Sequence, residues 1–249
     1  MLEYLLLVFM GPLIMGRIFL FIALFLPCAW SSAQEPKLYV FLPSPIRPHA
    51  MQTRLTQAFP EWDILVFGRF REFELQIETV PPAGILTLPV VAENFPDFKQ
   101  PIKGMRGQNS SEGYVLLSVN QPIQAFALPD QTIGAVDLLG RRKMELLLAK
   151  MLGQEKIRVR TVTKYEDLLS LLQFQDVDAI LVPKEVIGFY TERSRLNLVV
   201  NHLPGLNLEL PMIALRKDES QLAKERLTSL LTLNADLKKL LGVDLWQRP

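Results

Sequence analysis

Two connecting segments decide the architecture of this chain. The first runs from Leu116 to Val136, with the sequence LLSVNQPIQAFALPDQTIGAV, and the second runs from Leu206 to Asp218, with the sequence LNLELPMIALRKD. A stretch of about 70 residues with its own strand and helix patterns lies between them. A chain that leaves one α/β lobe, builds another and returns forms two lobes with a hinged cleft between them.

Apolar runs that end at proline or glycine alternate with amphipathic stretches along the chain. We expect strands at 37–42, 62–67, 83–89, 114–119, 132–136, 157–162, 177–182 and 196–200, and helices at 49–59, 140–152, 164–174, 185–190, 219–233 and 235–241. Thr163 and Glu166 form a capping-box pattern at the start of one of these helices. The stretch 69–82 fits both patterns in part and is assigned as mixed helix and loop, and 90–101 as loop or short helix.

This alternation predicts an α/β fold with mainly parallel sheets and helices on both faces. In such sheets ligands bind beyond the C-terminal ends of the strands, near the N-termini of the helices. Two units of this kind that face each other would place their strand ends on one cleft.

The composition excludes some classes of partner. The chain has 249 residues, 49% of them hydrophobic and 21% charged, with a net charge of +1. This balance is that of an ordinary globular protein and offers no basic excess for nucleic acid. We therefore expect no nucleic-acid partner.

The N-terminal segment has the pattern of an export signal. Arg17 precedes the apolar run Ile18–Leu26, and the small residues Ser31–Ala33 offer a cleavage site. We expect residues 1–33 to be a signal peptide and the mature protein to be periplasmic. Alternatively, Leu5–Leu26 is long enough to remain as a membrane anchor, and Met15 would make a more typical start than Met1.

Cys28 is the single cysteine of the chain and lies within the expected signal. Pro27 precedes it where a lipoprotein signal has a small residue, which argues against lipidation. After cleavage the chain would have no disulfide and no thiol nucleophile.

Four stretches resemble the type II periplasmic solute-binding proteins, the receptors of ABC importers. They are the crossing segment 120–136, the helix and strand at 165–172 and 177–180, the return strand 210–218 and the leucine-rich helices at the C-terminus. The resemblance implies a two-lobe fold with two hinge crossings, in which 34–118 and 207–249 form lobe 1 and 119–206 form lobe 2. It also implies a monomer that binds a small molecule and docks on a membrane permease or a sensor. The ligand class stays open between amino acids and oxyanions, because the loop 137–143 differs from the Ser/Thr-rich loops of phosphonate-type receptors.

Asp137, Arg141 and Arg142 are the first candidate ligand-binding residues. They follow the strand 132–136 and open a helix, where free backbone N–H groups and the helix dipole favour an anion. Arginine adds bidentate hydrogen bonding to carboxylate or phosphate. The alternative is a solvated first turn whose cations serve solubility.

Six further candidates are assigned from their positions at predicted strand ends or in glycine-rich loops. They are Ser44, Arg47, Thr87, Pro89, Arg106 and Pro183. Five of them have a structural alternative: a proline-rich turn for Ser44 and Arg47, a strand stop for Thr87 and Pro89, and a helix cap for Pro183; Arg106 is selected by its position alone.

No motif in the sequence indicates catalysis, a cofactor or a metal. Walker, Gly-x-Ser-x-Gly and His-Glu-x-x-His patterns are absent, and His49 and His202 have no third partner at metal-ligand spacing. We therefore predict a binding protein, not an enzyme, that closes on a small, anionic solute for an ABC-type importer. The alternatives are a solute-sensing or scaffold protein of the same fold and an exported enzyme on a two-lobe scaffold.

Overall fold

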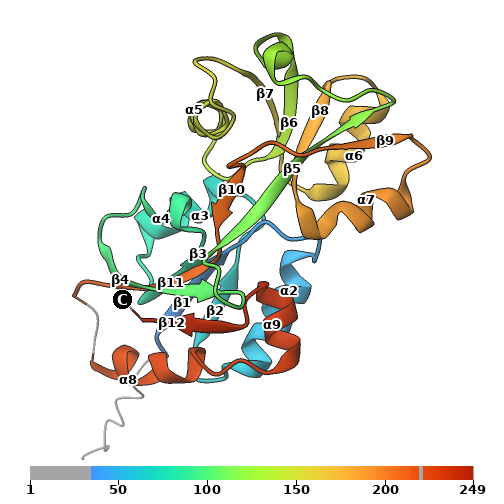
Figure 1. The fold of residues 1–249 in the computed structure, drawn as a ribbon. Coiled ribbons are helices and arrows are strands. Elements are labelled where there is room, and N and C mark those ends of the chain that lie inside the picture. The colour runs from blue at the N-terminus through green and yellow to red at the C-terminus, as the bar shows by residue number, and fades with distance from the viewer. Residues whose placement is uncertain (1–34, 219–220, 249) are drawn as a thin grey trace, which may run out of the picture. The chain divides into compact units, whose positions relative to one another are not determined.

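The computed structural model describes residues 35–218 and 221–248, which lie within the compact unit Glu35–Pro249 (Figure 1). The predicted signal peptide, residues 1–33, lies outside the described residues. None of the helices in the described part is long and apolar enough to cross a membrane.

The first sheet has six strands in the order β12-β4-β11-β3-β1-β2. Its members are β1 (Lys37–Phe41), β2 (Asp63–Val66), β3 (Gly84–Thr87), β4 (Phe98–Met105), β11 (Met212–Arg216) and β12 (Leu245–Gln247). Strand β1 pairs in parallel with β2 and β3, in the registers Lys37↔Asp63 and Leu38↔Gly84. Strand β11 returns antiparallel between β3 and β4, so the C-terminal part of the chain completes the lobe that the N-terminal part begins.

The helices of this lobe are α2 (Pro48–Ala58), α3 (Phe70–Thr79), α4 (Pro89–Ala92), α8 (Gln221–Leu230) and α9 (Ala235–Leu241). Each of the first two presents an apolar stripe to the sheet: Met51 and Leu55 are buried on α2, and Phe70, Phe73 and Ile77 on α3. Phe73 stacks on Phe41 of β1 with ring centroids 5.5 Å apart.

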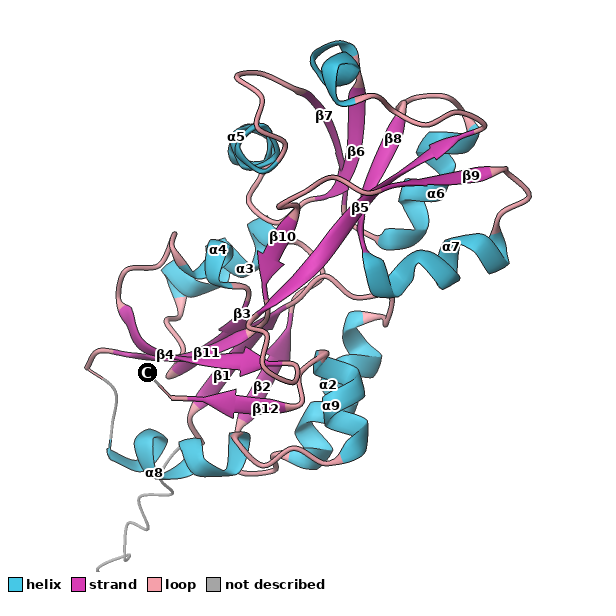
Figure 2. Cartoon of the chain, viewed as in Figure 1, coloured by secondary structure: helices cyan, strands magenta, loops and turns pink. Residues whose placement is uncertain are grey.

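The second sheet also has six strands, in the order β10-β5-β8-β6-β7 with β9 paired to β5 (Figure 2). They are β5 (Ser111–Val119), β6 (Thr132–Val136), β7 (Arg158–Val162), β8 (Ala179–Pro183), β9 (Leu198–Asn201) and β10 (Asn207–Glu209). The helices are α5 (Arg141–Met151), α6 (Tyr165–Gln173) and α7 (Ile187–Arg193), with short 3₁₀ helices η2 (Ala125–Asp130) and η3 (Lys184–Val186). Strands β6, β7 and β8 are parallel, as the alternating pattern predicts.

The two crossings between the lobes run side by side as an antiparallel ribbon of β5 and β10 (Figure 1). Its register is Asn207↔Gly113, Leu208↔Glu112 and Glu209↔Ser111. Tyr114–Ser118 already pair with β8 of the second sheet, although the sequence assigned them to lobe 1. This pairing favours a first crossing near residues 106–113, and we propose that boundary in place of 118/119.

The largest apolar cluster continues from one lobe into the other. It includes Phe41, Phe70 and Phe73 of the first lobe and Leu138, Met144 and Leu148 of the second. Separate clusters fill the far side of each sheet. The lobes therefore share an apolar contact beside the ribbon.

Three local predictions differ from the structure. The stretch 69–82 contains a regular helix, α3, because its buried residues recur at helical spacing. Strands β4, β10 and β12 were not predicted. Strand β4 carries Lys, Gln, Pro and Gly, and its long-range pairing with β11 and β12 makes it a strand. The capping box at Thr163 is wrong, since α6 begins after Lys164 and no side chain caps it.

Candidate functional site

The principal cavity lies where the ends of four parallel strands meet. It has a volume of about 600 Å³ and is lined by residues that follow β1 and β2 of the first sheet and β6 and β7 of the second. The lining comprises Phe41–His49, Met51 and Phe67 with its neighbours Val66 and Gly68 on one side, and Val136, Asp137 and Thr163–Asp167 on the other. A volume of this size suits a small-molecule ligand.

Two helices open onto this cavity with their N-termini. Arg47 is the N-cap residue of α2 and Lys164 that of α6, and neither helix has a side-chain hydrogen bond at its N-cap. The first backbone N–H groups of such helices have no partner within the helix and favour negative charge. The first turn of α6 carries Glu166 and Asp167, so the cavity lining holds charges of both signs.

Three of the sequence-predicted residues line the principal cavity: Ser44, Arg47 and Asp137. The Ser44 hydroxyl accepts a hydrogen bond of 3.0 Å from the Ile46 backbone N–H. The Asp137 carboxylate accepts hydrogen bonds from the backbone of Leu139 and Gly140, at 3.2 and 2.6 Å. Both side chains thus stabilise their own loops while facing the cavity.

Thr87 and Pro89 do not line the cavities between the lobes. Thr87 is fully buried, and its hydroxyl donates a hydrogen bond of 2.8 Å to the Phe41 carbonyl. Pro89 is the first residue of α4 and is half-buried. Their arrangement matches the structural alternative, a strand end locked to its neighbour.

Arg141 points away from the cavity. Its side chain is 82% exposed and forms an i,i+4 ion pair of 3.6 Å with Glu145. It lines a separate surface hollow between α5 and β7. Arg142 is exposed in the same first turn and is not among the residues that line the cavity. The buried apolar face of α5 sets the direction in which its other side chains point. The position of Arg141 and Arg142 after a strand did not reveal this direction.

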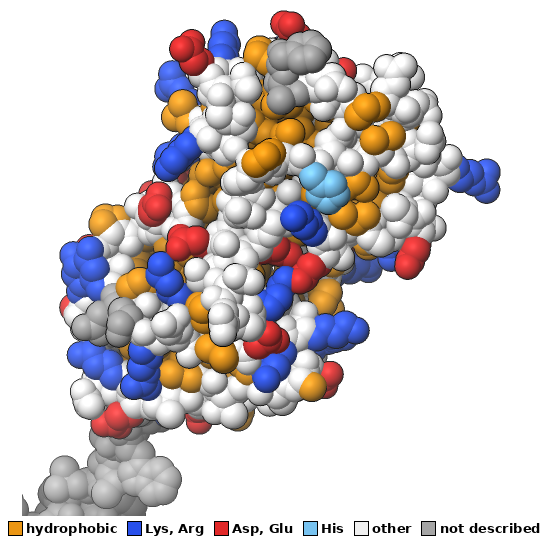
Figure 3. Space-filling view, viewed as in Figure 1, with side chains coloured by type: hydrophobic (Ala, Val, Ile, Leu, Met, Phe, Trp, Pro, Cys, Tyr) orange, Lys and Arg blue, Asp and Glu red, His pale blue; other side chains and the backbone are white. Residues whose placement is uncertain are grey.

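A second cavity of about 440 Å³ shares the loop Pro43–Ile46 with the principal cavity. Arg106 and Pro183, two more predicted residues, lie in its wall. Sequence reasoning did not single out Glu112, Tyr114 and Tyr165, which also line it. On the face shown in Figure 3, acidic and basic side chains are mixed at the junction of the lobes.

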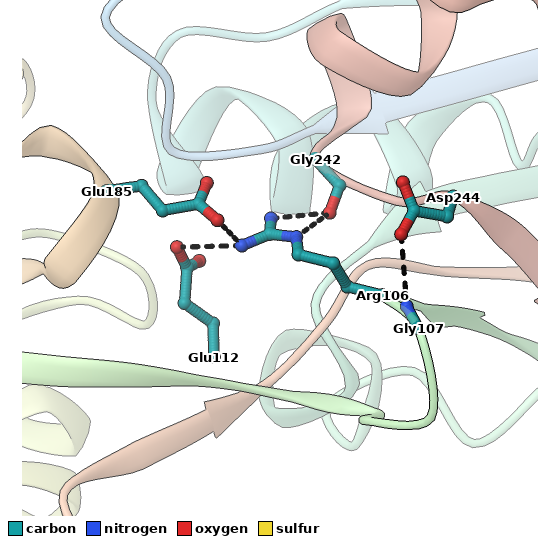
Figure 4. Close-up of polar contacts among 6 residues, drawn as sticks. All are labelled: Arg106, Gly107, Glu112, Glu185, Gly242 and Asp244. Atoms are coloured by element: carbon teal, nitrogen blue, oxygen red, sulfur yellow. Dashed lines mark hydrogen bonds and ion pairs between the residues drawn. The ribbon is translucent and has the colours of Figure 1, made fainter.

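Arg106 is held by three groups from different parts of the fold (Figure 4). Its Nε and Nη2 atoms donate to the Gly242 carbonyl, at 3.0 and 2.5 Å. Its Nη1 atom lies 3.5 Å from Glu112 and forms a closer ion pair with Glu185. All three nitrogens of the guanidinium are therefore engaged by the protein itself.

Burial shifts the ionisation of the groups next to Arg106. Desolvation raises the pKa of Glu112, and the Arg106 guanidinium partly offsets this rise. Tyr114 and Tyr165 line the same cavity, and burial raises the pKa of both phenols. Both tyrosines therefore stay protonated at neutral pH and offer hydroxyl groups at the seam between the lobes.

Lys164, Glu166 and Asp167 are cavity residues that sequence reasoning missed. They follow β7, whose end lies beside that of β6 in a parallel pair. The strand-end rule that selected Asp137 applies equally to them. Among the described residues, no group of three or more His, Cys, Asp or Glu side chains is placed to hold a metal ion.

Several solved structures have a fold similar to that of this chain. The VFT2 domain of Bordetella pertussis BvgS is 16% identical, with a TM-score of 0.55 over 83% of this chain and 91% of that one. The amino acid ABC transporter substrate-binding protein AbpA of Streptococcus pneumoniae, bound to L-arginine, is 14% identical, with a TM-score of 0.55 over 84% and 94%. The GluR0 ligand-binding core of Nostoc punctiforme, in complex with L-glutamate, is 17% identical, with a TM-score of 0.56 over 82% and 96%.

The chain therefore has the two-lobe fold of the type II periplasmic solute-binding proteins, which confirms the fold class predicted from the sequence. No protein-family model matches the chain, and no curated protein matches its sequence. The likeness rests on the arrangement of the strands and helices and not on sequence identity.

Proposed function

We propose that this protein is an exported solute-binding protein whose two lobes close around one small solute in the principal cavity. The observation that carries the proposal is the convergence of four parallel strand ends, two from each sheet, on a cavity of about 600 Å³. Ligands of open α/β sheets bind at such ends. The ribbon of β5 and β10 supplies the hinge about which the lobes would move.

We propose further that the solute carries an anionic group. The N-termini of α2 and α6 face the cavity without side-chain caps, and Arg47 and Lys164 stand at those two ends. Aligned backbone N–H groups and a cation together favour a carboxylate or an oxyanion. The predicted anion contact thus moves from Arg141 and Arg142 to these two residues.

Glu166 and Asp167 narrow the choice of solute. They add negative charge to the same cavity, which suits a solute that also carries a cationic group. An amino acid meets both demands, and AbpA and the GluR0 core bind amino acids. We therefore place amino acids ahead of simple oxyanions.

For the cellular role we propose a periplasmic monomer that delivers its solute to an ABC-type permease, as expected of a protein with an export signal and this fold. A solute sensor or scaffold of the same fold is the alternative, and an exported enzyme is a second one. A permease gene and an ATPase gene beside this gene would favour import. Turnover of a bound solute would favour the enzyme.

The binding proposal is tested by thermal unfolding of the full chain against amino acids, other carboxylates, phosphate and sulfate. A solute that binds the folded state raises the melting temperature in proportion to the logarithm of its concentration over its Kd. We expect an amino acid to stabilise the wild type and the Arg141→Gln/Arg142→Gln variant equally. The Arg47→Gln/Lys164→Gln variant should lose the stabilisation.

Two results would contradict this proposal. If no solute raises the melting temperature, the solute-binding role fails. If the Arg141→Gln/Arg142→Gln variant loses binding while the Arg47→Gln/Lys164→Gln variant keeps it, the solute contacts the start of α5 and the assignment to α2 and α6 is wrong.

A further inference from the structure

We infer that Arg106 is a positioning residue that latches the two lobes together in the absence of solute. It joins the first lobe, through Gly242, to the second lobe, through Glu185. The inference rests on the proposed function in one respect, since the latch would control access to the proposed cleft. Closure of the lobes can be measured without a solute.

The backbone of Arg106 is fixed to the first lobe. Arg106 and Asn109 exchange backbone hydrogen bonds of 2.8 and 3.0 Å, which close a tight turn between β4 and β5. The Gly107 N–H donates to the Asp244 carboxylate at 3.0 Å (Figure 4), and the Asp244 N–H donates to the Met105 carbonyl at 2.7 Å. The C-terminal segment thus holds the turn from which the Arg106 side chain extends.

The carboxylate partner of Arg106, Glu185, is fixed to the second lobe. Glu185 lies in η3, directly after β8, and β8 pairs with β5 in the register Tyr114↔Pro183. A Cβ atom on Gly113 would lie 3.0 Å from the Lys184 side chain, so η3 packs closely on the crossing strand. This packing presents the Glu185 carboxylate to Arg106 from the side of the second lobe.

Glu112 gives the latch a third contact on the crossing strand itself. Its carboxylate and that of Glu185 approach the same nitrogen, Nη1 of Arg106. The Arg106 and Glu112 side chains are 30% and 19% exposed, so their attraction is screened less than that of a surface pair. Opening of the lobes would separate Arg106 from Glu185 while Gly242 keeps its hold on the guanidinium.

The contacts of Arg106 also suggest different roles for the two cavities. Each nitrogen of Arg106 has a protein partner and two carboxylates lie beside it, so its charge is already balanced by the protein, which makes it a poor anchor for an anionic solute. The uncapped ends of α2 and α6 lie in the other cavity. The first cavity is left for the solute, and the second holds the latch.

The test measures the distance between the lobes in the full chain without added solute. Cys28 is the single cysteine, so a Cys28→Ser background accepts spin labels at Arg54→Cys on α2 and Glu192→Cys on α7, both exposed. We expect a short distance in this background. Arg106→Gln should lengthen it and raise the ratio of open to closed molecules about fivefold.

Glu185→Gln should lengthen the distance in the same way. It keeps the contact of Arg106 with Gly242, so it tests the latch even if Arg106→Gln does not fold. The matched control is Arg160→Gln, which removes an arginine–aspartate pair of 3.2 Å within the second lobe. The latch is disproved if Glu185→Gln leaves the distance unchanged, or if Arg160→Gln lengthens it equally. Solute binding is scored separately by thermal shift, so a working latch without any ligand would overturn the proposed function and not this inference.

Discussion

The Nζ atom of Lys143 donates a hydrogen bond of 2.6 Å to the Oδ1 atom of Asn94, which joins α5 of the second lobe to the turn after α4 in the first. The Asn94 amide is oriented for this contact, because its Nδ2 atom donates to the Val91 carbonyl at 3.0 Å. Together with Arg106 and Glu185, this pair gives the lobes a second polar bridge, built from different elements.

Replacement of Lys143 by Met should weaken this second bridge. Both partners are partly exposed to water, so we expect a loss of about 0.5 kcal/mol in the free energy of unfolding. Urea unfolding measures the loss. The control is Lys156→Met, which removes an exposed lysine of the same lobe. Equal losses in the two variants would show that the bridge adds nothing beyond the charge.

Thr87→Val should lower stability without affecting solute binding. The substitution keeps the shape of the side chain but removes the donor of the buried hydrogen bond to the Phe41 carbonyl, at a cost of about 1 kcal/mol. Thr79→Val, at an exposed site at the end of α3, should change stability less. If Thr87→Val instead abolished binding while stability held, Thr87 would contact the solute, as the sequence suggested.

The stability of the protein should respond to Glu112 in a pH-dependent way. Burial raises the pKa of this carboxyl above its ordinary value of 4.5, so the folded protein binds the proton more tightly than the unfolded chain does. The group therefore contributes most stability below the ordinary pKa, and that contribution is lost as the pH rises through the raised pKa of the folded state.

Glu112→Gln removes this titration. The free energy of unfolding of the variant, relative to the wild type, should therefore increase between about pH 4 and about pH 7. Urea unfolding of both proteins at the two pH values checks the sign. A relative stability that falls over this interval would mean that attraction by Arg106, and not burial, dominates the ionisation of Glu112.

Gly242→Ala should be more costly than an equivalent change elsewhere. Gly242 has φ +69°, and a Cβ atom there would lie 2.8 Å from Nη2 of Arg106. Gly153 has φ +64° with no atom within 4 Å of its Cβ position, so Gly153→Ala carries the backbone strain alone, about 1 kcal/mol. Urea unfolding should show the larger loss for Gly242→Ala. Equal losses would mean that the Arg106 side chain moves away from the new Cβ atom without a further loss of stability.

The strand-end rule predicted part of the site and missed another part for a definable reason. Ser44, Arg47 and Asp137 follow strands whose apolar runs are plain in the sequence, and all three line the principal cavity. Lys164 follows β7, whose end at residue 162 was also predicted, but the residues after it were assigned to a helix cap and not to the site. Arg141 follows the rule in position, but the buried stripe Met144, Leu148 and Ala149 turns it outward.

The sequence by itself determined most of the order of strands and helices, their apolar faces and an outward and a return crossing, because these follow from local periodicity and from proline and glycine stops. The tertiary structure decided which strand ends share one cavity and which side chains meet across the lobes. Arg106 and Glu185 lie far apart in the sequence, and their contact depends on the pairing of β5 with β8 and of β12 with β4. Such pairings are set by packing between distant segments, which no local pattern encodes.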